Sequence, residues 1–403
     1  MIMQKSEIKI GLKKKVWGEE VFSLLSWFDT EKVGKARVMV VGAGALGNEV
    51  LKNLALFGIG NIVIVDFDKI EHSNLCRSVL FRPADVDRGS MKAAVAAERV
   101  KEINPLVNVS FVAGDIGCDV GLGLIRRMDV VIGCLDSRLA RYLINRQCFR
   151  ANRPWVDGGI ENLEGNARVF RPGVNCYECS LSETELNMLK YRTGCPDIAR
   201  INSTQGRVAT TPVSSSIIGA IQVQEALKII HGFNEQSLDN PCKTLSGRLL
   251  KYDGMRLTLQ NFRSENYNDD CLSHDFWEPV IQAGELSADT NVADALKILK
   301  GLLKSEDIAI NLMNNKLIYQ LVNETNEEEI NVILPESKIP NYIDEKNLKK
   351  NPRERIFQKY FEDIDADFPY PGLKLKDIGI PKLDILHVTS SAGIHYVELT
   401  GDE

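Results

Sequence analysis

Three glycines, Gly42, Gly44 and Gly47, follow the apolar run Val38–Val41 with the spacing of a phosphate-binding turn. Such a turn lets backbone N–H groups and a helix N-terminus approach a ligand phosphate, because no Cβ atom blocks the way. Asp66 closes the next apolar run, and an acidic residue at such a place commonly holds a ribose hydroxyl. On these residues alone, the pattern favours a dinucleotide site of the kind found in NAD- or FAD-dependent oxidoreductases.

A second group of polar residues disturbs that interpretation. It contains two carboxylates, an amide and two cations, and its members are Asp68, Asn74, Arg77, Lys92 and Asp136. A triphosphate needs Arg and Lys donors to match its charge, whereas a nicotinamide site does not. A carboxylate at a strand end is a natural ligand for Mg²⁺. Taken singly, each residue is explained as a surface charge, but their order and combination favour ATP with Mg²⁺.

Two distant pairs of residues form a set that suits a tetrahedral metal ion. Cys176 and Cys179 make a C-x-x-C pair, and Cys271 and His274 make a C-x-x-H pair. Zn²⁺ accepts three sulfurs and one imidazole nitrogen, and four protein ligands would close the site and make it structural. The alternative is that no metal binds and that the C-x-x-C pair is redox-active or accidental.

Cys195 lies in the irregular stretch Tyr191–Pro196 and is a candidate nucleophile. Arg192 and Arg200 would favour its thiolate electrostatically. The residues alone do not separate this role from that of an ordinary loop cysteine. Cys242 is a weaker candidate. The remaining cysteines lie in or beside predicted strands and helices and are expected to pack in the core: Cys76, Cys118, Cys134 and Cys148.

Strands and helices that alternate along the chain must position these residues. The predicted strands are 37–41, 61–65, 107–112, 129–134, 154–157 and 166–170, and the predicted helices are 48–57, 91–103 and 138–152. This order predicts an α/β fold with a doubly wound, mostly parallel sheet. A long helix over 212–231 and two antiparallel strands, 246–252 and 256–262, are expected to follow.

Bulk composition excludes several classes of protein. A chain of 403 residues predicts two domains, and its net charge of −6 argues against a nucleic-acid-binding face as its main purpose. Apolar residues make up 44% of the chain, but no run approaches the length that spans a bilayer. The segment Met1–Lys15 has lysines without an apolar run behind them, so we do not predict a signal peptide. The chain has 9 cysteines, an odd number that forms no regular disulfide framework. Since no export signal is predicted either, we expect a cytoplasmic protein.

The combined motif resembles the adenylation domain of the ubiquitin-activating and ThiF/MoeB/HesA superfamily. The resemblance covers about residues 16 to 274 and rests on the residues already described together with the segments Ser73–Arg77 and Cys134–Asp136. It implies a Rossmann-like enzyme that uses ATP and Mg²⁺ to adenylate the C-terminal glycine of a ubiquitin-like protein.

The resemblance also implies roles for individual residues. Asp66 would hold the ribose beside the glycine turn and Ala45, with Asp68 close by. The phosphates would be contacted by the amide of Asn74 and by the cations Arg77 and Lys92. Asp136 would place Mg²⁺. The two cysteine pairs would bind structural Zn²⁺, and Cys195 would take the activated protein as a thioester. Relatives often carry an N-terminal arginine before a Trp-Gly pair, but here Lys13-Lys14-Lys15 precedes Trp17-Gly18.

We expect the adenylation domain to span residues 1–275 and a small α+β domain to span 276–403. The second domain is expected to carry strands 308–313, 317–322 and 330–334, a helix over 292–304, a long polar excursion over 337–366 and a terminal hairpin of 383–388 and 394–399. It bears no chemical motif, so it serves either to recruit a partner or to cap and stabilise the enzyme.

The sequence thus predicts an activating enzyme for a ubiquitin-like protein that passes its thioester to a conjugating enzyme. A homodimer is expected, since the chain has a single adenylation unit. The first alternative is a sulfur-carrier adenylyltransferase of thiamin or molybdopterin biosynthesis, without thioester transfer. The others are an NAD-binding oxidoreductase and a non-catalytic scaffold.

Overall fold

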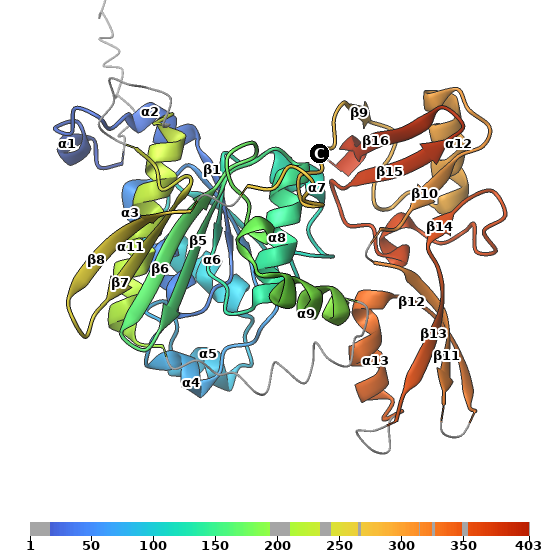
Figure 1. Ribbon diagram of the computed structural model, residues 1–403, viewed down its shortest axis with the longest axis horizontal. Helices are drawn as coiled ribbons and strands as arrows, with labels where there is room; N and C mark the ends of the chain where they lie inside the picture. The colour runs from blue at the N-terminus through green and yellow to red at the C-terminus, as the bar shows by residue number, and fades with distance from the viewer. Residues whose placement is uncertain are drawn as a thin grey trace, which may run out of the picture.

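A computed structural model describes residues 17–193, 210–233, 243–264, 267–313, 315–324, 327–348 and 354–402, with the side chains of 190–193 left out. Its N-terminal part is built on one eight-stranded sheet, and its C-terminal region carries a five-stranded and a three-stranded sheet beside it (Figure 1). In the described part of the chain, no helix combines the length and the apolar content that crossing a membrane requires.

The large sheet confirms the predicted doubly wound fold. Its strand order is β3-β2-β1-β4-β5-β6-β7-β8, parallel from β3 to β5 and antiparallel from β5 to β8. The strands are β1 (Arg37–Val41), β2 (Asn61–Val65), β3 (Asn108–Val112), β4 (Val130–Gly133), β5 (Trp155–Glu161), β6 (Glu164–Phe170), β7 (Arg248–Asp253) and β8 (Thr258–Arg263). The order reverses between β1 and β4, and ligands of such sheets bind outside the carboxyl ends of the strands at that point.

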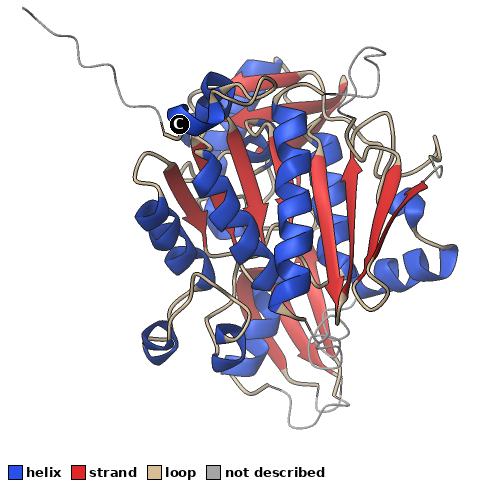
Figure 2. Cartoon of the chain, turned by 90° about the vertical axis from the view of Figure 1, so that its left-hand side faces the viewer, coloured by secondary structure: helices blue, strands red, loops and turns tan. Residues whose placement is uncertain are grey.

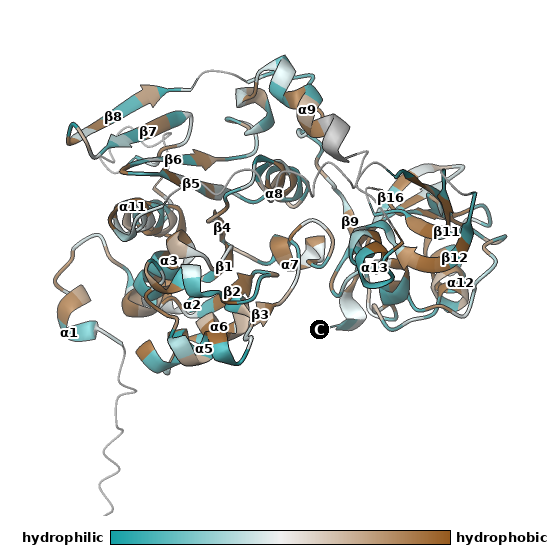
Figure 3. Ribbon diagram, turned by 90° about the horizontal axis from the view of Figure 1, so that it is seen from below, coloured by the Kyte–Doolittle hydropathy of each residue, from teal (hydrophilic) through white to brown (hydrophobic). Residues whose placement is uncertain are grey.

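Helices cover both faces of the parallel part, as Figures 2 and 3 show. One face packs against α3 (Ala45–Phe57), α6 (Lys92–Ile103) and α11 (Pro212–Ile230), and the other against α7 (Leu122–Arg126) and α8 (Arg138–Arg150). In β1, Val38 and Val40 join the first core, and Met39 and Val41 join the second. A strand buried on both faces has no polar side, which explains its uninterrupted apolar sequence. Shorter helices complete this part: α1 (Glu19–Phe22), α2 (Thr30–Lys35), α4 (His72–Leu75), α5 (Pro83–Asp87), η1 (Glu178–Ser180) and α9 (Glu183–Thr193).

The C-terminal region has cores of its own. Its two sheets have the orders β14-β10-β15-β16-β9 and β12-β11-β13. The elements are β9 (Val280–Ala283), α12 (Val292–Leu303), β10 (Ala309–Asn311), β11 (Leu317–Asn323), β12 (Glu329–Pro335), η2 (Glu336–Lys338), α13 (Ile339–Glu345), β13 (Ile356–Phe361), β14 (Asp363–Ile364), η3 (Leu375–Ile378), β15 (Ile385–Ser390), β16 (Gly393–Leu399) and η4 (Thr400–Asp402). The predicted terminal hairpin is confirmed as β15 and β16.

Two predictions of irregular chain were wrong. The polar excursion expected over 337–366 contains α13, β13 and β14. Strand β13 pairs with β11, and Ile339 and Ile343 of α13 pack in one core with Ile318 and Leu321 of β11. The stretch Tyr191–Pro196 was expected to be irregular, but α9 (Glu183–Thr193) continues into it as far as Thr193. Among the α9 side chains that the structure describes, Leu186 and Leu189 pack into the second core, which is too short an apolar pattern to reveal a helix.

Two carboxylates, Glu398 and Asp384, join the C-terminal region to the N-terminal part. Glu398 on β16 is 1% exposed and forms ion pairs with Arg126 at 3.2 Å and with Arg127. The α7 end comes this close because Gly121 and Gly123 lack Cβ atoms, which would overlap Lys382, Leu383 and Glu398. Replacing one partner of such a buried pair would leave an uncompensated charge, so Glu398 and its two arginines are matched to each other across this junction.

Asp384 also lies at this junction, where it accepts a hydrogen bond from the Leu122 backbone N–H at 2.9 Å. Burial raises its pKa to about 6 from an ordinary 3.8. A raised carboxyl pKa stabilises the folded state at low pH, and this stabilisation is lost as the pH rises through about 6. Asp384→Asn is therefore expected to raise the free energy of unfolding by about 2 kcal/mol at neutral pH.

Thermal unfolding of both proteins across the pH range measures this effect. The gain should shrink as the pH falls from about 6 through about 4, and well below that pH Asp384 is neutral in both the folded and the unfolded state. The exposed Asp367→Asn serves as the control for a change of net charge. A gain that is independent of pH would show that ionisation of Asp384 plays no part.

Candidate functional site

The carboxyl ends of β2, β1 and β4 lie next to one another and carry the predicted site residues. Asp66 follows β2, the glycine turn follows β1, and Asp136 follows β4. Parallel pairing puts all three at one edge of the sheet, at the point where the strand order reverses. This is where an open α/β sheet binds its ligand.

The three glycines of the turn have different surroundings, which explain why each position suits glycine. Gly42 has a φ of 95°, and a Cβ atom there would overlap the carbonyl oxygen of Cys134. A Cβ atom on Gly47 would overlap the carbonyl oxygen of Gly42. Gly44 has open space in the direction of a Cβ atom, and Ala45 begins α3 directly after it. The turn is thus packed against backbone atoms at Gly42 and Gly47, which form its closed back. In front it has open space at Gly44, where the free N–H groups of the first helical turn can meet an anion.

Asp66 ties the glycine turn to the end of β2. Its carboxylate accepts hydrogen bonds from the backbone N–H groups of Ala43 at 2.6 Å and Asp68 at 2.8 Å. Burial raises the pKa of Asp66, and nearby Lys92 and the two backbone donors oppose that rise. The Lys92 ammonium donates to the Asp68 carboxylate at 2.7 Å, and its side chain is 11% exposed. The structure therefore brings Asp66, Asp68 and Lys92 together beside the turn.

Arg77 and Asn74 make other contacts. The Arg77 guanidinium donates to the hydroxyl of Thr210, just before α11, and its buried Nε has no hydrogen-bond partner among the described residues. The amide oxygen of Asn74 accepts from the Glu71 backbone N–H at 2.9 Å and so caps α4. Asn74 thus has a local structural role here, and Arg77 contacts the segment that precedes α11.

Asp136 stands exposed at the edge of the sheet. Its carboxylate makes no hydrogen bond or ion pair with any part of the chain that the structure describes. A free, solvated carboxylate beside a phosphate-binding turn fits a hard cation such as Mg²⁺.

Sequence reasoning missed the buried polar residues behind this edge. Asn48 is fully buried; its amide donates to the carbonyl oxygens of Ala43 at 2.7 Å and Gly44 at 2.9 Å, and its oxygen accepts from the Leu80 N–H. Arg141 and Asp157 form a buried ion pair at 2.8 Å. The only signal in the sequence was a polar residue on the apolar face of a predicted helix, which is too common to single out Asn48.

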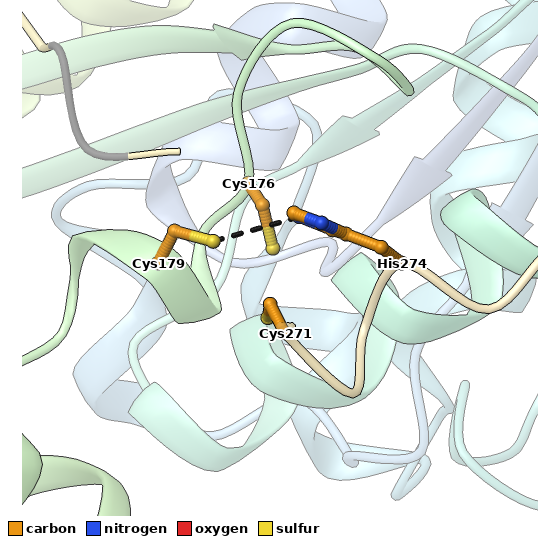
Figure 4. Close-up of side chains that lie close together, drawn as sticks. All are labelled: Cys176, Cys179, Cys271 and His274. Atoms are coloured by element: carbon orange, nitrogen blue, oxygen red, sulfur yellow. Dashed lines mark hydrogen bonds between the residues drawn. The ribbon is translucent and has the colours of Figure 1, made fainter. Parts of the chain in front are cut away.

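The predicted metal ligands converge. Cys176, Cys179, Cys271 and His274 place their ligand atoms within 4.8 Å of one another, although they come from two segments far apart in the chain (Figure 4). His274 Nε2 lies 3.5 Å from Cys179 Sγ, and the imidazole is stacked between Tyr267 and Phe149.

Hydrogen-bond donors surround this set, and they favour the thiolate of one member, Cys179. Asn145 donates to Cys176 Sγ at 3.1 Å, and the Asn268 backbone N–H donates to Cys179 Sγ at 3.4 Å. Hydrogen bonds from the neighbouring Cys176 and Cys271 side chains lower the pKa of the Cys179 thiol. Metal ligation requires deprotonated sulfur, so the donor set and its hydrogen bonds fit tetrahedral Zn²⁺.

Several predicted residues lie outside the described part of the chain or differ from expectation. Cys195, Cys242 and Lys13-Lys14-Lys15 fall outside the described residues. Among the cysteines expected to pack, Cys148 is buried, but Cys76 is exposed. Cys76 is the residue that directly follows the short helix α4.

Comparison with known proteins identifies the family. The ThiF family model matches residues 16–273, so the chain belongs to the ThiF family. It is 35% identical to the SAMP-activating enzyme E1 of Haloferax volcanii over 59% of this chain and 79% of that protein. It is 31% identical to the sulfur carrier protein adenylyltransferase of Thermus thermophilus over 57% of this chain and 79% of that protein. It is 38% identical to the SUMO-activating enzyme subunit uba-2 of Caenorhabditis elegans over 38% of this chain and 27% of that protein.

Solved structures share the fold. A crystal structure of Escherichia coli MccB with ATP matches with a TM-score of 0.51 and 23% identity, over 66% of this chain and 75% of that one. The microcin C7 biosynthetic enzyme MccB with N-formylated MccA matches with a TM-score of 0.50 and 23% identity, over 65% of this chain and 75% of that one. These matches support the Rossmann-like fold of the ThiF domain.

Proposed function

We propose that this protein is an ATP-dependent activating enzyme for a ubiquitin-like protein. The observation that carries the proposal is the meeting of the open glycine turn, the Asp66–Asp68–Lys92 group and the free carboxylate of Asp136 at one edge of the sheet. The names of relatives support it, since they include activating enzymes and adenylyltransferases.

The first step is adenylation. A carboxylate oxygen of the partner's C-terminal glycine attacks the α-phosphorus of ATP, the bond to the β-phosphate breaks, and pyrophosphate leaves. Lys92 and Arg77 offset the phosphate charge, the N–H groups of the glycine turn bind phosphate oxygens, and Asp66 binds the ribose. Asp136 would hold Mg²⁺, which supplies further positive charge to the phosphates when bound.

The second step is thioester formation. The thiolate of Cys195 attacks the acyl carbonyl of the adenylate, AMP leaves, and the partner remains bound through a C–S bond. A conjugating enzyme would then accept the partner on its own cysteine. We further propose that the enzyme works as a homodimer in the cytoplasm, that Zn²⁺ occupies the Cys176–His274 set and that the C-terminal region from residue 276 recruits a partner.

A sulfur-carrier adenylyltransferase is the second candidate. The relative from Thermus thermophilus carries that name and is nearly as similar as the SAMP-activating enzyme. In this case adenylation is unchanged, but no thioester forms on Cys195. An NAD-binding oxidoreductase is disfavoured because the chain belongs to the ThiF family.

ATP–pyrophosphate exchange tests the proposal, with small ubiquitin-like proteins of the source organism that end in glycine as partners. We expect exchange that depends on one such partner and falls at least about 100-fold in Asp136→Asn, because the variant loses the carboxylate that holds the cation. The exposed Asp367→Asn is the matched control and should keep full exchange. Unchanged exchange in Asp136→Asn would contradict the assigned site.

The two candidates differ in the adduct with the partner. A thiol-sensitive adduct with the wild-type enzyme that is absent in Cys195→Ala identifies the thioester route. Exchange without any adduct identifies the sulfur-carrier adenylyltransferase. Tight NAD binding with no response to ATP would overturn both.

A further inference from the structure

A buried ion pair lies directly behind the loop that carries Asp136. Arg141 is on the second turn of α8, and its Nε donates to the Asp157 carboxylate on β5 at 2.8 Å. The Arg141 side chain is 13% exposed and that of Asp157 is 5% exposed. Burying two charges costs desolvation energy that an apolar pair of similar volume would avoid. Stabilisation of the fold is therefore a weak explanation for this ion pair.

The rest of the guanidinium joins two backbone segments. Its Nη2 donates to the carbonyl oxygen of Leu135 at 2.5 Å and to that of Gly158 at 3.0 Å. Leu135 immediately precedes Asp136, and Gly158 belongs to β5. The planar fork of arginine can serve three acceptors in fixed directions, which the single ammonium of lysine cannot do. Arg141 thereby fixes the Asp136 loop relative to the sheet.

The same strand ends are held from the opposite face of the sheet. The fully buried Gln222 of α11 donates to the carbonyl oxygens of Gly133 at 2.8 Å and Val156 at 3.3 Å. Gly158 has no Cβ atom, which would overlap the Gln222 side chain. The end of β4 and the adjacent first half of β5 are therefore held from both faces of the sheet, and the Leu135 carbonyl, beyond the end of β4, is held by Arg141.

We propose that Arg141, oriented by Asp157, is a positioning residue that sets the Asp136 carboxylate for binding of the metal–nucleotide complex. The inference rests on the proposed function, because it takes Asp136 as the cation ligand. Arg141 itself touches no substrate; it acts through the backbone of Leu135. Outer residues that orient a metal ligand typically change metal affinity 10- to 100-fold when they are replaced.

Calorimetry with an uncleavable ATP analogue tests the inference without a partner protein. The analogue has a methylene bridge between its α- and β-phosphates, and Mn²⁺ serves as the metal probe. The measured quantity is the tightening of analogue binding that Mn²⁺ produces. In Arg141→Lys, the increase in analogue affinity that Mn²⁺ produces is expected to be about tenfold smaller than in the wild type. The affinity for the analogue without metal is expected to stay unchanged.

A double variant serves as the control for effects on folding. Arg141→Met alone leaves Asp157 buried without its partner, whereas Arg141→Met with Asp157→Leu removes both charges and is expected to keep the wild-type melting temperature within a few degrees, since such swaps are often neutral. The double variant should still lose the metal effect. Arg138→Met is the matched control for charge, because Arg138 lies one turn earlier on α8 and is 60% exposed. It should keep the metal effect.

The outcomes separate the two proposals. If Asp136→Asn abolishes the metal effect but the double variant keeps it, the role of Arg141 is wrong and the proposed site stands. If Asp136→Asn itself keeps the metal effect, or if the wild-type protein does not bind the analogue, the proposed function fails first. Equal losses in Arg138→Met and in the Arg141 variants would reveal a general charge effect and overturn the positioning role.

Discussion

Gly47→Ala is expected to lose both folding stability and nucleotide binding. A Cβ atom at Gly47 would overlap the carbonyl oxygen of Gly42, and backbone on both sides of this contact belongs to the turn. Overpacking of this kind typically costs 1–3 kcal/mol and more where backbone must move, so we expect a loss of at least about 3 kcal/mol. Chemical denaturation and calorimetric binding of ATP measure the two effects.

Gly44→Ala is the matched variant that separates the two effects. No atom lies within 4 Å of the position that its Cβ would take, and its φ of −72° is open to any residue. Gly44 is the N-cap of α3, where alanine is a poorer residue than glycine, so we expect a stability loss below about 1 kcal/mol. ATP affinity should still fall at least about tenfold, because the methyl group projects into the space left for the phosphates.

The comparison of the two variants decides what the open space in front of the turn is for. If Gly44→Ala binds ATP as the wild type does, then the phosphates do not approach the turn at this point, and the glycine has only a conformational role. If Gly47→Ala folds as well as Gly44→Ala, then the turn can relax and its closed back is not rigid. Either outcome would contradict the geometry of the turn.

Removal of the metal is expected to destabilise the protein by on the order of 5 kcal/mol, since a structural Zn²⁺ site contributes its binding energy to folding. The ion would tie η1 to the Cys271–His274 loop, and without it three sulfurs crowd one site. Thermal unfolding with and without a strong chelator, together with measurement of bound zinc, tests this. Cys271→Ser should reproduce the loss, and the exposed Cys76→Ser is its matched control.

Metal removal should also loosen the junction with the C-terminal region. Trp277 follows His274 closely, is 4% exposed, and lies between the Arg150 guanidinium at 4.7 Å and the stacked ring of Tyr396 at 4.9 Å. Freed of the metal, this segment should become sensitive to proteolysis, and tryptophan emission should shift to longer wavelength. Identical melting and cleavage in the two states, with no zinc in the purified protein, would disprove a structural metal.

Local patterns in the sequence determined the framework of this protein. The apolar runs Val38–Val41 and Ile62–Val65 predicted neighbouring buried strands, and the glycine spacing predicted the turn between β1 and α3. Both signals lie within a few residues, where the backbone conformation follows from side-chain type and period. The C-x-x-C and C-x-x-H spacings likewise identified the four side chains that converge in the folded chain.

Tertiary contacts decided what those patterns could not. Pairing with β11 turned part of the polar stretch 337–366 into β13, and packing against α7 buried Glu398 between two arginines. Asn74 caps α4, and Arg141 reaches across to Asp157 and Leu135. A buried polar side chain is stable only where its partners meet it, and those partners come from other strands and helices. The sequence by itself therefore determined which residues line the edge of the sheet, and only the tertiary structure decided which of them are free to bind a ligand and which hold the others in place.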